Sequence, residues 1–278
     1  MKKKKTLLKK IDGLLRQARV PVFLHHFGPK TYTTWQHCKA WLLKENLRCS
    51  WQQFIDDYAG YFLEKIPERS TLIKFSQRLP IWLKALLVKL SAGCQPAEFG
   101  AMDSTGLSRS CASNYYLKRI DQDEPVKRCL KLSMYTSKRR ILSFRLRAKW
   151  RGDTKDVPYL IRHAPILAIT TCLDKGYDAD WVHREFRDRG RCSVIPARKG
   201  CKRGKYRKEM RDFFDYSQYW ERNCAEYNNS SLKRRFGSFV RSVSFCAQHS
   251  EVAARIILHN LRALLSGLFH RSPDQRKI

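Results

Sequence analysis

Acidic residues are scarce in this 278-residue chain, which has 25 Asp and Glu against 56 Lys and Arg and a formal net charge of +31. A surplus of this size opposes compaction by self-repulsion and suits a polyanionic partner. Hydrophobic residues still make up 43% of the chain, which excludes a disordered basic tail. Nucleic acid is the polyanion that these numbers favour, and an anionic membrane surface is the weaker alternative.

The chain also lacks a hydrophobic run long enough to span a bilayer. Its most apolar stretch, residues 81–90, contains Lys84 and Lys89, whereas a spanning helix needs ~20 predominantly apolar residues. Charged residues likewise interrupt residues 6–15, where a secretory signal would be apolar. These absences argue against a membrane protein and predict a cytoplasmic location.

No Cys-x-x-Cys pair occurs among the ten cysteines, which are scattered along the chain. We therefore expect reduced thiols rather than a disulfide framework. A zinc site built from Cys192, Cys201, His163 or His183 is a minor alternative, because structural zinc sites favour closely spaced ligand pairs.

Helical patterns dominate the N-terminal third of the chain. Apolar residues recur at helical spacing in residues 35–47 and 51–63, Ser70 is placed to cap another helix, and residues 81–90 form a further apolar helix. We therefore predict a helical N-terminal region over residues 1–95. It either reads DNA as a helix-turn-helix does or only packs on the rest of the chain, and the sequence favours neither.

Beyond a Gly- and Pro-containing break at residues 91–96, the patterns predict an α/β domain over residues 96–248. The expected strands are residues 99–103, 129–135, 141–149, 164–173 and 192–196, and the expected helices are residues 179–189 and 217–240. The third strand alternates, with one side formed by Leu142, Phe144, Leu146 and Ala148 and the other by Ser143, Arg145, Arg147 and Lys149. Residues 198–211 are expected to form a basic loop. Residues 249–278 are predicted to be a C-terminal helix, at 251–268, followed by a polar tail.

Two acids sit where predicted strands end. Asp103 follows one short apolar strand and Asp174 follows a longer one. Ligands collect beyond the carboxyl ends of strands in open α/β sheets. Taken alone, each acid could instead belong to a simple turn, with Gly176 supplying a positive φ after Asp174.

Four polar side chains fall on one stripe of the last predicted helix. Tyr219, Arg222, Glu226 and Lys233 lie within roughly 60° of one another at about 100° per residue. The alternative without a function is a solvent-exposed helix face with an Arg222–Glu226 ion pair, which stabilises the helix by only ~0.2–0.5 kcal/mol. Another stripe of this helix is expected to pack against the sheet: Trp220, Cys224 and Tyr227.

Three carboxylates brought together would repel one another unless cations lie between them. Carboxylate oxygens are ligands that Mg²⁺ and Mn²⁺ prefer. Two such ions, about 3.5–4 Å apart, can support an in-line phosphodiester displacement. Asp103, Asp174 and Glu226 therefore predict phosphodiester chemistry inside a basic protein.

The motifs around these acids resemble those of insertion-sequence DDE transposases with a Y-R-E-K signature. Met102-Asp103-Ser-Thr-Gly106, with Ser113-Asn-Tyr-Tyr116 and Arg119, is similar to the first catalytic motif of that family. Leu173-Asp174-Lys-Gly-Tyr-Asp178, with Ile195-Pro196-Ala-Arg198, is similar to the second, and Tyr219-x2-Arg222-x3-Glu226-x6-Lys233 matches the third. The resemblance covers residues 65–265.

This resemblance implies an RNase H-like catalytic core, a mixed sheet flanked by helices. It implies that Asp103, Asp174 and Glu226 are catalytic and bind two Mg²⁺ or Mn²⁺ ions. It also implies that the enzyme nicks the element's end and transfers the freed 3′-OH to target DNA. The stretch at residues 197–211 then stands where a larger inserted domain would otherwise lie.

The same resemblance assigns DNA binding to Tyr219, Arg222 and Lys233. The expected partners are double-stranded DNA, as terminal inverted repeats and target, and a second copy in a homodimeric synaptic complex. The expected location is the nucleoid of a prokaryotic cytoplasm. Asp178 is a weaker candidate for the second metal ligand, and an N-cap role for it is favoured.

Two other functions remain open at this point. A non-catalytic DNA-binding protein from a decayed element would keep the basic surface without cleaving DNA. A structure-selective nuclease could use the same core. The Y-R-E-K spacing argues against the nuclease. Because all three acids are present, the sequence shows no loss of catalysis, and it favours the active transposase.

Overall fold

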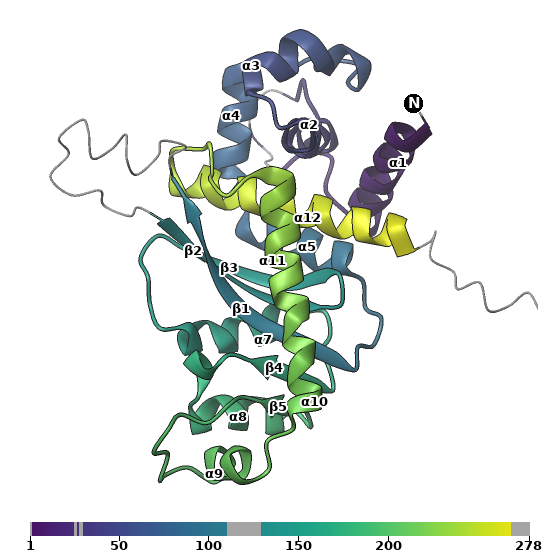
Figure 1. Ribbon diagram of the computed structural model, residues 1–278. Coiled ribbons are helices and arrows are strands. Elements are labelled where there is room, and N and C mark those ends of the chain that lie inside the picture. The colour runs from purple at the N-terminus through teal and green to yellow at the C-terminus, as the bar shows by residue number, and fades with distance from the viewer. Residues whose placement is uncertain (1, 25–26, 28–29, 110–128, 268–278) are drawn as a thin grey trace, which may run out of the picture.

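A five-stranded mixed sheet forms the centre of the computed structural model, which describes residues 2–24, 27, 30–109 and 129–267 (Figure 1). The strand order is β3-β2-β1-β4-β5. β1 pairs antiparallel with β2 and parallel with β4, β2 pairs antiparallel with β3, and β4 pairs parallel with β5. The bounds are β1 Phe99–Ser108, β2 Cys129–Ser137, β3 Arg140–Arg147, β4 Thr170–Leu173 and β5 Cys192–Val194. This arrangement confirms the expected α/β class and is consistent with an RNase H-like core.

The β2–β3 hairpin follows the predicted alternation with one exception. Phe144 and Leu146 pack in one core while Ser143 lies on the opposite face, where it donates to the carbonyl of Leu160. Leu142 was expected beside Phe144 but packs in the opposite core. The register shifts between Tyr135 and Thr136, which leaves Leu142 as an extra residue and turns its side chain over.

Helices cover both faces of the sheet, and each face has its own apolar core. The larger core joins one face to the N-terminal helices and to α12. Its helices are α1 Lys2–Gln17, α2 Thr34–Leu47, α4 Arg69–Arg78, α5 Ile81–Ala92, α11 Asn223–Phe236 and α12 Phe245–Gly267. The smaller core joins the other face to α7 (Val157–His163) and α8 (Asp180–Arg187).

Helices predicted in the N-terminal region are present, with two corrections. The helix expected at residues 51–63 is irregular, because α3 (Trp51–Gln53) continues as a π-turn at Phe54–Tyr58 and a 3₁₀ turn at Ala59–Tyr61. The prediction that Ser70 caps a helix is wrong. α4 begins at Arg69 and Glu68 is its N-cap, so Ser70 already lies in the first turn.

In the C-terminal half, three expected elements change length or type. The strand expected at residues 164–173 is reduced to β4, and α7 precedes it. The basic loop contains a helix, α9 (Lys205–Asp212). The long helix expected at residues 217–240 consists of α10 (Tyr216–Tyr219), a 3₁₀ turn at Trp220–Arg222 and α11, which ends before Gly237.

Helices from all parts of the sequence share the larger core. Ile11 of α1, Trp41 of α2 and Ile256 of α12 are all buried there with the sheet. The division into residues 1–95, 96–248 and 249–278 stays a prediction. Within the described residues, no helix combines the length and apolar character needed to cross a bilayer.

Candidate functional site

Parallel pairing of β1 with β4 brings Asp103 and Asp174 side by side. The pairing ends at Met102 opposite Leu173, and each acid is the next residue in its strand's direction. Asp174 follows β4 directly, as predicted, and caps the 3₁₀ turn Lys175–Tyr177. The prediction that Asp103 ends a strand is wrong, since β1 continues along β2 to Ser108. The same observation rules out a simple turn at Asp103.

Alternation along β1 turns Asp103 and Thr105 toward α11 and Ser104 away from it. The hydroxyl of Ser104 hydrogen-bonds on the opposite face to Ser133 Oγ at 2.9 Å and to the Tyr177 hydroxyl at 3.2 Å. These bonds anchor β1 at the residue that follows Asp103. The backbone that carries the carboxylate is thereby held in place.

α11 lies across β1 with matched spacing (Figure 1). Asn229 Nδ2 donates to Asp103 Oδ2 at 2.8 Å, and Lys233 Nζ donates to Thr105 Oγ1 at 2.5 Å. Two strand residues advance about 6.8 Å and four helical residues about 6 Å, so the two contacts stay in step. Glu226, three residues before Asn229, lies on the same stripe of the helix. We call Asp103, Asp174 and Glu226 the carboxylate site.

The three acids lie close enough for their charges to influence one another. Burial raises the pKa of Asp103, and the negative charges of Asp174 and Glu226 raise it further. The N–H of Ser104 and the Arg222 guanidinium act in the opposite direction. A carboxylate in this field gains from any added cation.

Tyr219 and Arg222 belong to the same surroundings. Burial raises the pKa of the Tyr219 hydroxyl, with added contributions from the charges of Asp174 and Glu226. The guanidinium of Arg222 lies 5.8 Å from the Tyr219 ring centroid and forms an ion pair with Glu226. The 3₁₀ turn Trp220–Arg222 explains the stacking, because side chains three residues apart eclipse in that geometry.

The expected apolar stripe of this helix is only partly correct. Cys224 faces the sheet, with its Sγ 3.6 Å from Thr136 Oγ1. Trp220 and Tyr227, in contrast, are 71% and 42% exposed, so the prediction that they pack against the sheet is wrong. The extra rotation of the 3₁₀ turn displaces Trp220 from the regular helical stripe.

Each acid of the carboxylate site has a partner from the protein. Asp103 accepts from Asn229, Glu226 pairs with Arg222, and Asp174 Oδ1 accepts from the N–H of Lys175 at 2.7 Å. Over residues 2–24, 27, 30–109 and 129–267, no three His, Cys, Asp or Glu side chains are close enough to hold a metal ion. In this arrangement the carboxylate of Glu226 is engaged by Arg222.

The donor set nevertheless suits a hard divalent cation. It offers three carboxylates and, beside Asp103, the Asn229 Oδ1 atom, which is buried and has no hydrogen-bond partner in the described part of the chain. Sequence reasoning missed Asn229. The available signal was its place three residues after Glu226 and four before Lys233, on the predicted stripe.

Asp178 is held by the basic stretch and is not an N-cap. Ala179 caps α8 without a side-chain bond. Both oxygens of Asp178 accept from Arg207, at 2.7 and 2.8 Å, and one also accepts from the N–H of Arg198. Burial alone would raise the pKa of Asp178, but these bonds leave it below its usual value. With its oxygens occupied, Asp178 ties residues 197–211 to α8.

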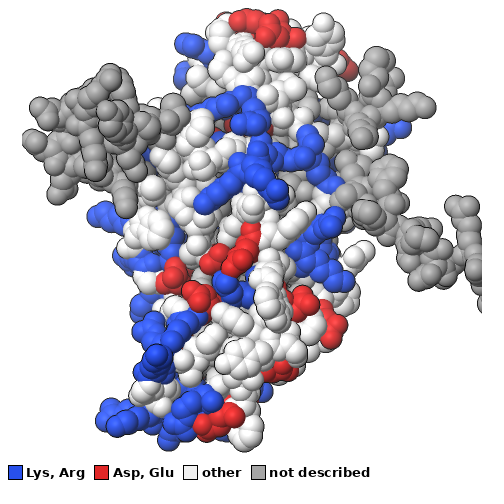
Figure 2. Space-filling model, in the orientation of Figure 1, with Lys and Arg blue, Asp and Glu red and all other residues white. Residues whose placement is uncertain are grey.

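Arginines line an open hollow farther along α11. We call it the arginine hollow, and it is lined by Ser231, Arg234, Arg235 and Arg262. Burial, and then the charge of Arg235, lowers the pKa of Arg262. Arg234 lies eight residues beyond Glu226, about 12 Å along the helix. Figure 2 shows acidic side chains gathered on this face with Lys and Arg around them.

Part of the first motif cannot be placed in this geometry. Ser113, Tyr116 and Arg119 lie outside the described residues. The remaining six predicted site residues come together around β1, β4 and the α10–α11 run.

Two solved structures are similar to the fold of this chain. One is a piggyBac transposase synaptic complex with hairpin DNA, with a TM-score of 0.48 and 9% identity over 95% of this chain and 73% of that chain. Another is the Mos1 strand transfer complex, with a TM-score of 0.33 and 10% identity over 93% of this chain and 76% of that chain. No protein-family model and no curated protein matches the sequence. At such identities and scores, the function has to be inferred from this chain's own side chains.

Proposed function

We propose that this protein is a DNA transposase of the DDE type, which cleaves the ends of its insertion sequence and joins the freed 3′-OH to target DNA. The observation that carries the proposal is the meeting of Asp103, Asp174 and Glu226 from β1, the end of β4 and α11. Three acids that repel one another are stabilised by bound metal cations, even on a chain of net charge +31.

Asp103, Asp174 and Glu226 would hold two Mg²⁺ or Mn²⁺ ions, which supply a nucleophilic oxygen and stabilise the leaving oxygen when bound. Asn229 orients Asp103 through its 2.8 Å hydrogen bond. No Ser or Tyr nucleophile is needed, since water or a DNA 3′-OH attacks phosphorus directly.

Arg222 becomes free to bind DNA when its ion pair with Glu226 is broken. Its planar guanidinium can donate two parallel hydrogen bonds to a DNA phosphate. Lys233, now bound to Thr105 Oγ1, and the hydroxyl of Tyr219 face the same region. These three groups would grip the DNA end next to the carboxylates and keep the reacting phosphate in line.

The arginine hollow would add phosphate contacts farther along α11, on residues that lie about 80–180° around the helix from Glu226. Its guanidiniums have no carboxylate among the side chains that line the hollow. Phosphate contacts of this kind bind any sequence and make affinity depend steeply on salt. Joining two element ends requires two such sites, so the proposed working form is a homodimer with both ends bound.

The test uses a DNA fragment that spans the coding region and its flanking inverted repeats. We expect wild-type protein to nick the fragment ends in Mg²⁺ or Mn²⁺. Asp103→Asn, Asp174→Asn and Glu226→Gln should each reduce cleavage by about 10³-fold, since each removes an ion ligand worth several kcal/mol. Asp212→Asn is the control, because Asp212 is exposed and its ion pair is with its neighbour Arg211.

Three results would contradict the proposal. Cleavage that survives all three substitutions would show that the acids are not catalytic. Wild-type protein that binds duplex DNA but cleaves none would be a non-catalytic DNA-binding protein. Cleavage restricted to branched DNA, without strand joining, would indicate a structure-selective nuclease.

A further inference from the structure

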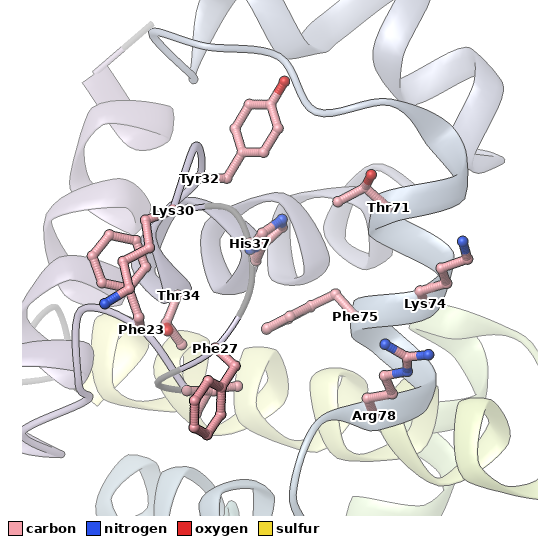
Figure 3. Close-up of a pocket in the computed structure, with 11 residues that line it drawn as sticks. Phe23, Phe27, Lys30, Tyr32, Thr34, His37, Thr71, Lys74, Phe75 and Arg78 are labelled. Carbon is pink, nitrogen blue, oxygen red and sulfur yellow. The ribbon is translucent and has the colours of Figure 1, made fainter.

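A second cation-rich region lies in the N-terminal helices, away from the carboxylate site. A pocket of about 280 Å³ opens between α2, α4 and the segment before α2 (Figure 3). We call it the aromatic pocket. It is lined by Phe23, Leu24, Phe27, Lys30, Tyr32, Thr34, His37, Thr71, Lys74, Phe75 and Arg78.

Flat rings form one wall of the aromatic pocket. The rings of His37 and Phe75 are stacked, with centroids 4.8 Å apart and planes 18° apart. Tyr32 meets His37 edge-on, with centroids 5.8 Å apart. The Phe23 ring lies across the opening from Phe75 (Figure 3). Walls of this kind favour a planar aromatic ligand.

Cations stand around these rings, and no carboxylate is among the lining residues. Lys74 and Arg78 project from α4 on one side, four residues apart and both exposed. Lys30 lies on the other side, with its Nζ 5.4 Å from the centroid of the Phe23 ring. The ligand should therefore carry negative charge at its edges as well as a flat ring.

His37 adds a polar atom to the wall. Its Nε2 is buried and lacks a hydrogen-bond partner among the described residues. Burial lowers the pKa of His37, although a hydrogen bond with the backbone of Thr33 opposes this shift. The stacked pair therefore includes one buried hydrogen-bonding atom that the described residues leave without a partner.

We propose that the aromatic pocket binds an unpaired nucleobase of DNA, stacked on the ring of Phe75, whose other face is covered by His37, with the adjoining phosphates on Lys74, Arg78 and Lys30. The inference rests on the proposed function only in taking DNA as the partner. A base inside a duplex cannot enter, because both of its faces and its pairing edge are occupied. The pocket therefore selects DNA with an extrahelical or single-stranded nucleotide.

The binding test needs no cleavage and is run in EDTA. Two duplexes are compared, one fully paired and one with a single unpaired 2-aminopurine. We expect the second to bind wild-type protein about tenfold more tightly, with 2-aminopurine fluorescence quenched by stacking. Phe75→Leu, which keeps an apolar side chain but removes the flat ring, should abolish most of the preference. Tyr61→Ala is the matched control, since Tyr61 is 82% exposed and lies outside the pocket.

Surface variants keep the test meaningful if Phe75→Leu unfolds. Lys74→Ala and Arg78→Ala should each weaken binding of the unpaired-base duplex several-fold more than Lys65→Ala, an exposed cation outside the pocket. Equal affinity for the two duplexes would overturn the proposal, as would unchanged quenching in the pocket variants. Binding of free adenosine monophosphate without any preference for the unpaired-base duplex would also overturn it.

The outcomes separate this inference from the proposed function. Protein that prefers the unpaired base but never cleaves DNA would leave the pocket assignment standing and remove the transposase. Protein that cleaves the element ends with no preference for an unpaired base would do the reverse.

Discussion

The carboxylate site and the aromatic pocket are both surrounded by Lys and Arg, yet they differ in what the cations enclose. At the carboxylate site, Arg222 and Lys233 stand beside three acids. At the aromatic pocket, Lys74 and Arg78 stand beside stacked rings, with no acid in the lining. DNA can bind at both regions, because it has phosphates and bases. Acids that bind metal ions suit a reaction at a phosphate, whereas aromatic rings suit the binding of a base.

The two regions also depend on different parts of the fold. The carboxylate site depends on the pairing of β1 with β4. The pairing of Met102 with Leu173 places the next residues, Asp103 and Asp174, side by side. The aromatic pocket is set by side-chain packing of α2 and α4 on α12 within the larger core. Damage to the pairing of β1 with β4 should therefore affect the carboxylate site more than the aromatic pocket.

The largest expected effect is a reciprocal loss of function. Glu226→Gln should reduce metal-dependent cleavage about 10³-fold and leave the preference for an unpaired base within twofold. Phe75→Leu should remove that preference while cleavage of fully paired ends falls at most severalfold. Parallel cleavage and fluorescence assays on the two variants check this. If either variant loses both properties, the two regions act as one site and the comparison fails.

Acid should loosen the packing of α12 on the sheet and on α11, because His249 lies against Phe144 of β3 and His259 bonds to Asn228 of α11. Burial lowers the pKa of His249 and of His259, both on α12, to about 4, whereas an unfolded chain has a His pKa near 6.5. The unfolded state therefore takes up protons first as the pH falls below about 6.5. Stability present at pH 7 is lost toward pH 4, by about 2 kcal/mol per His at pH 5.

Urea unfolding of the wild type and of His259→Gln at pH 7 and pH 5 measures this effect. Glutamine can keep a donor toward Asn228 Oδ1, which lies 2.9 Å from His259 Nε2. The loss of stability between the two pH values should be about 2 kcal/mol smaller in the variant. Hydrogen exchange at pH 5 should accelerate in α12, and in the elements that these histidines contact, β3 and α11, more than in β4 and β5. Equal acceleration in β4 and β5 would show that the histidines do not act locally.

A smaller effect is expected where the basic stretch meets α8. Asp178→Asn removes the charge that binds Arg207 at 2.7 Å. Because Arg207 then lacks its ionic partner, we expect the free energy of unfolding to fall by about 2 kcal/mol. Thermal unfolding should show the loss, and proteases should cut residues 197–204 sooner. Asp212→Asn, at an exposed pair, should leave the melting temperature unchanged. Equal effects of the two substitutions would show that Asp178 does not anchor this stretch.

Sequence patterns predicted the parts of the fold that local chemistry determines. The hairpin of β2 and β3, the helix α5 and the position of Asp174 after β4 follow from alternation, apolar spacing and strand ends. α9 was missed because five of its eight residues are Lys, Arg or Glu and its support comes from elsewhere. Arg187 pairs with Glu209, and the N–H of Tyr206 donates to Asp180.

For the carboxylate site, the sequence supplied the residue types and the structure supplied their partners. Spacing on one helix was enough to group Arg222 and Glu226. The contact between Asn229 and Asp103 joins residues 126 positions apart, so no local pattern contains it. The exposure of Trp220 depends on one 3₁₀ turn, which the periodicity of an ideal helix does not include.

Fixed contacts between β1 and the chain after Glu226 restrict how this protein could change in length. Asn229 and Lys233 reach Asp103 and Thr105, and beyond Gly237 the backbone of residues 238–240 bonds to Ser108. One inserted residue between Glu226 and Gly237 would turn the helix by about 100° and carry the acid off its stripe. Between Asp174 and α10, the contact to β1 stands near the start of the interval, where the Tyr177 hydroxyl lies 3.2 Å from Ser104 Oγ. The chain from Asp178 to Asp215 can change in length without moving that contact. Insertions and whole added segments should therefore be accepted between these two acids and rejected after the second.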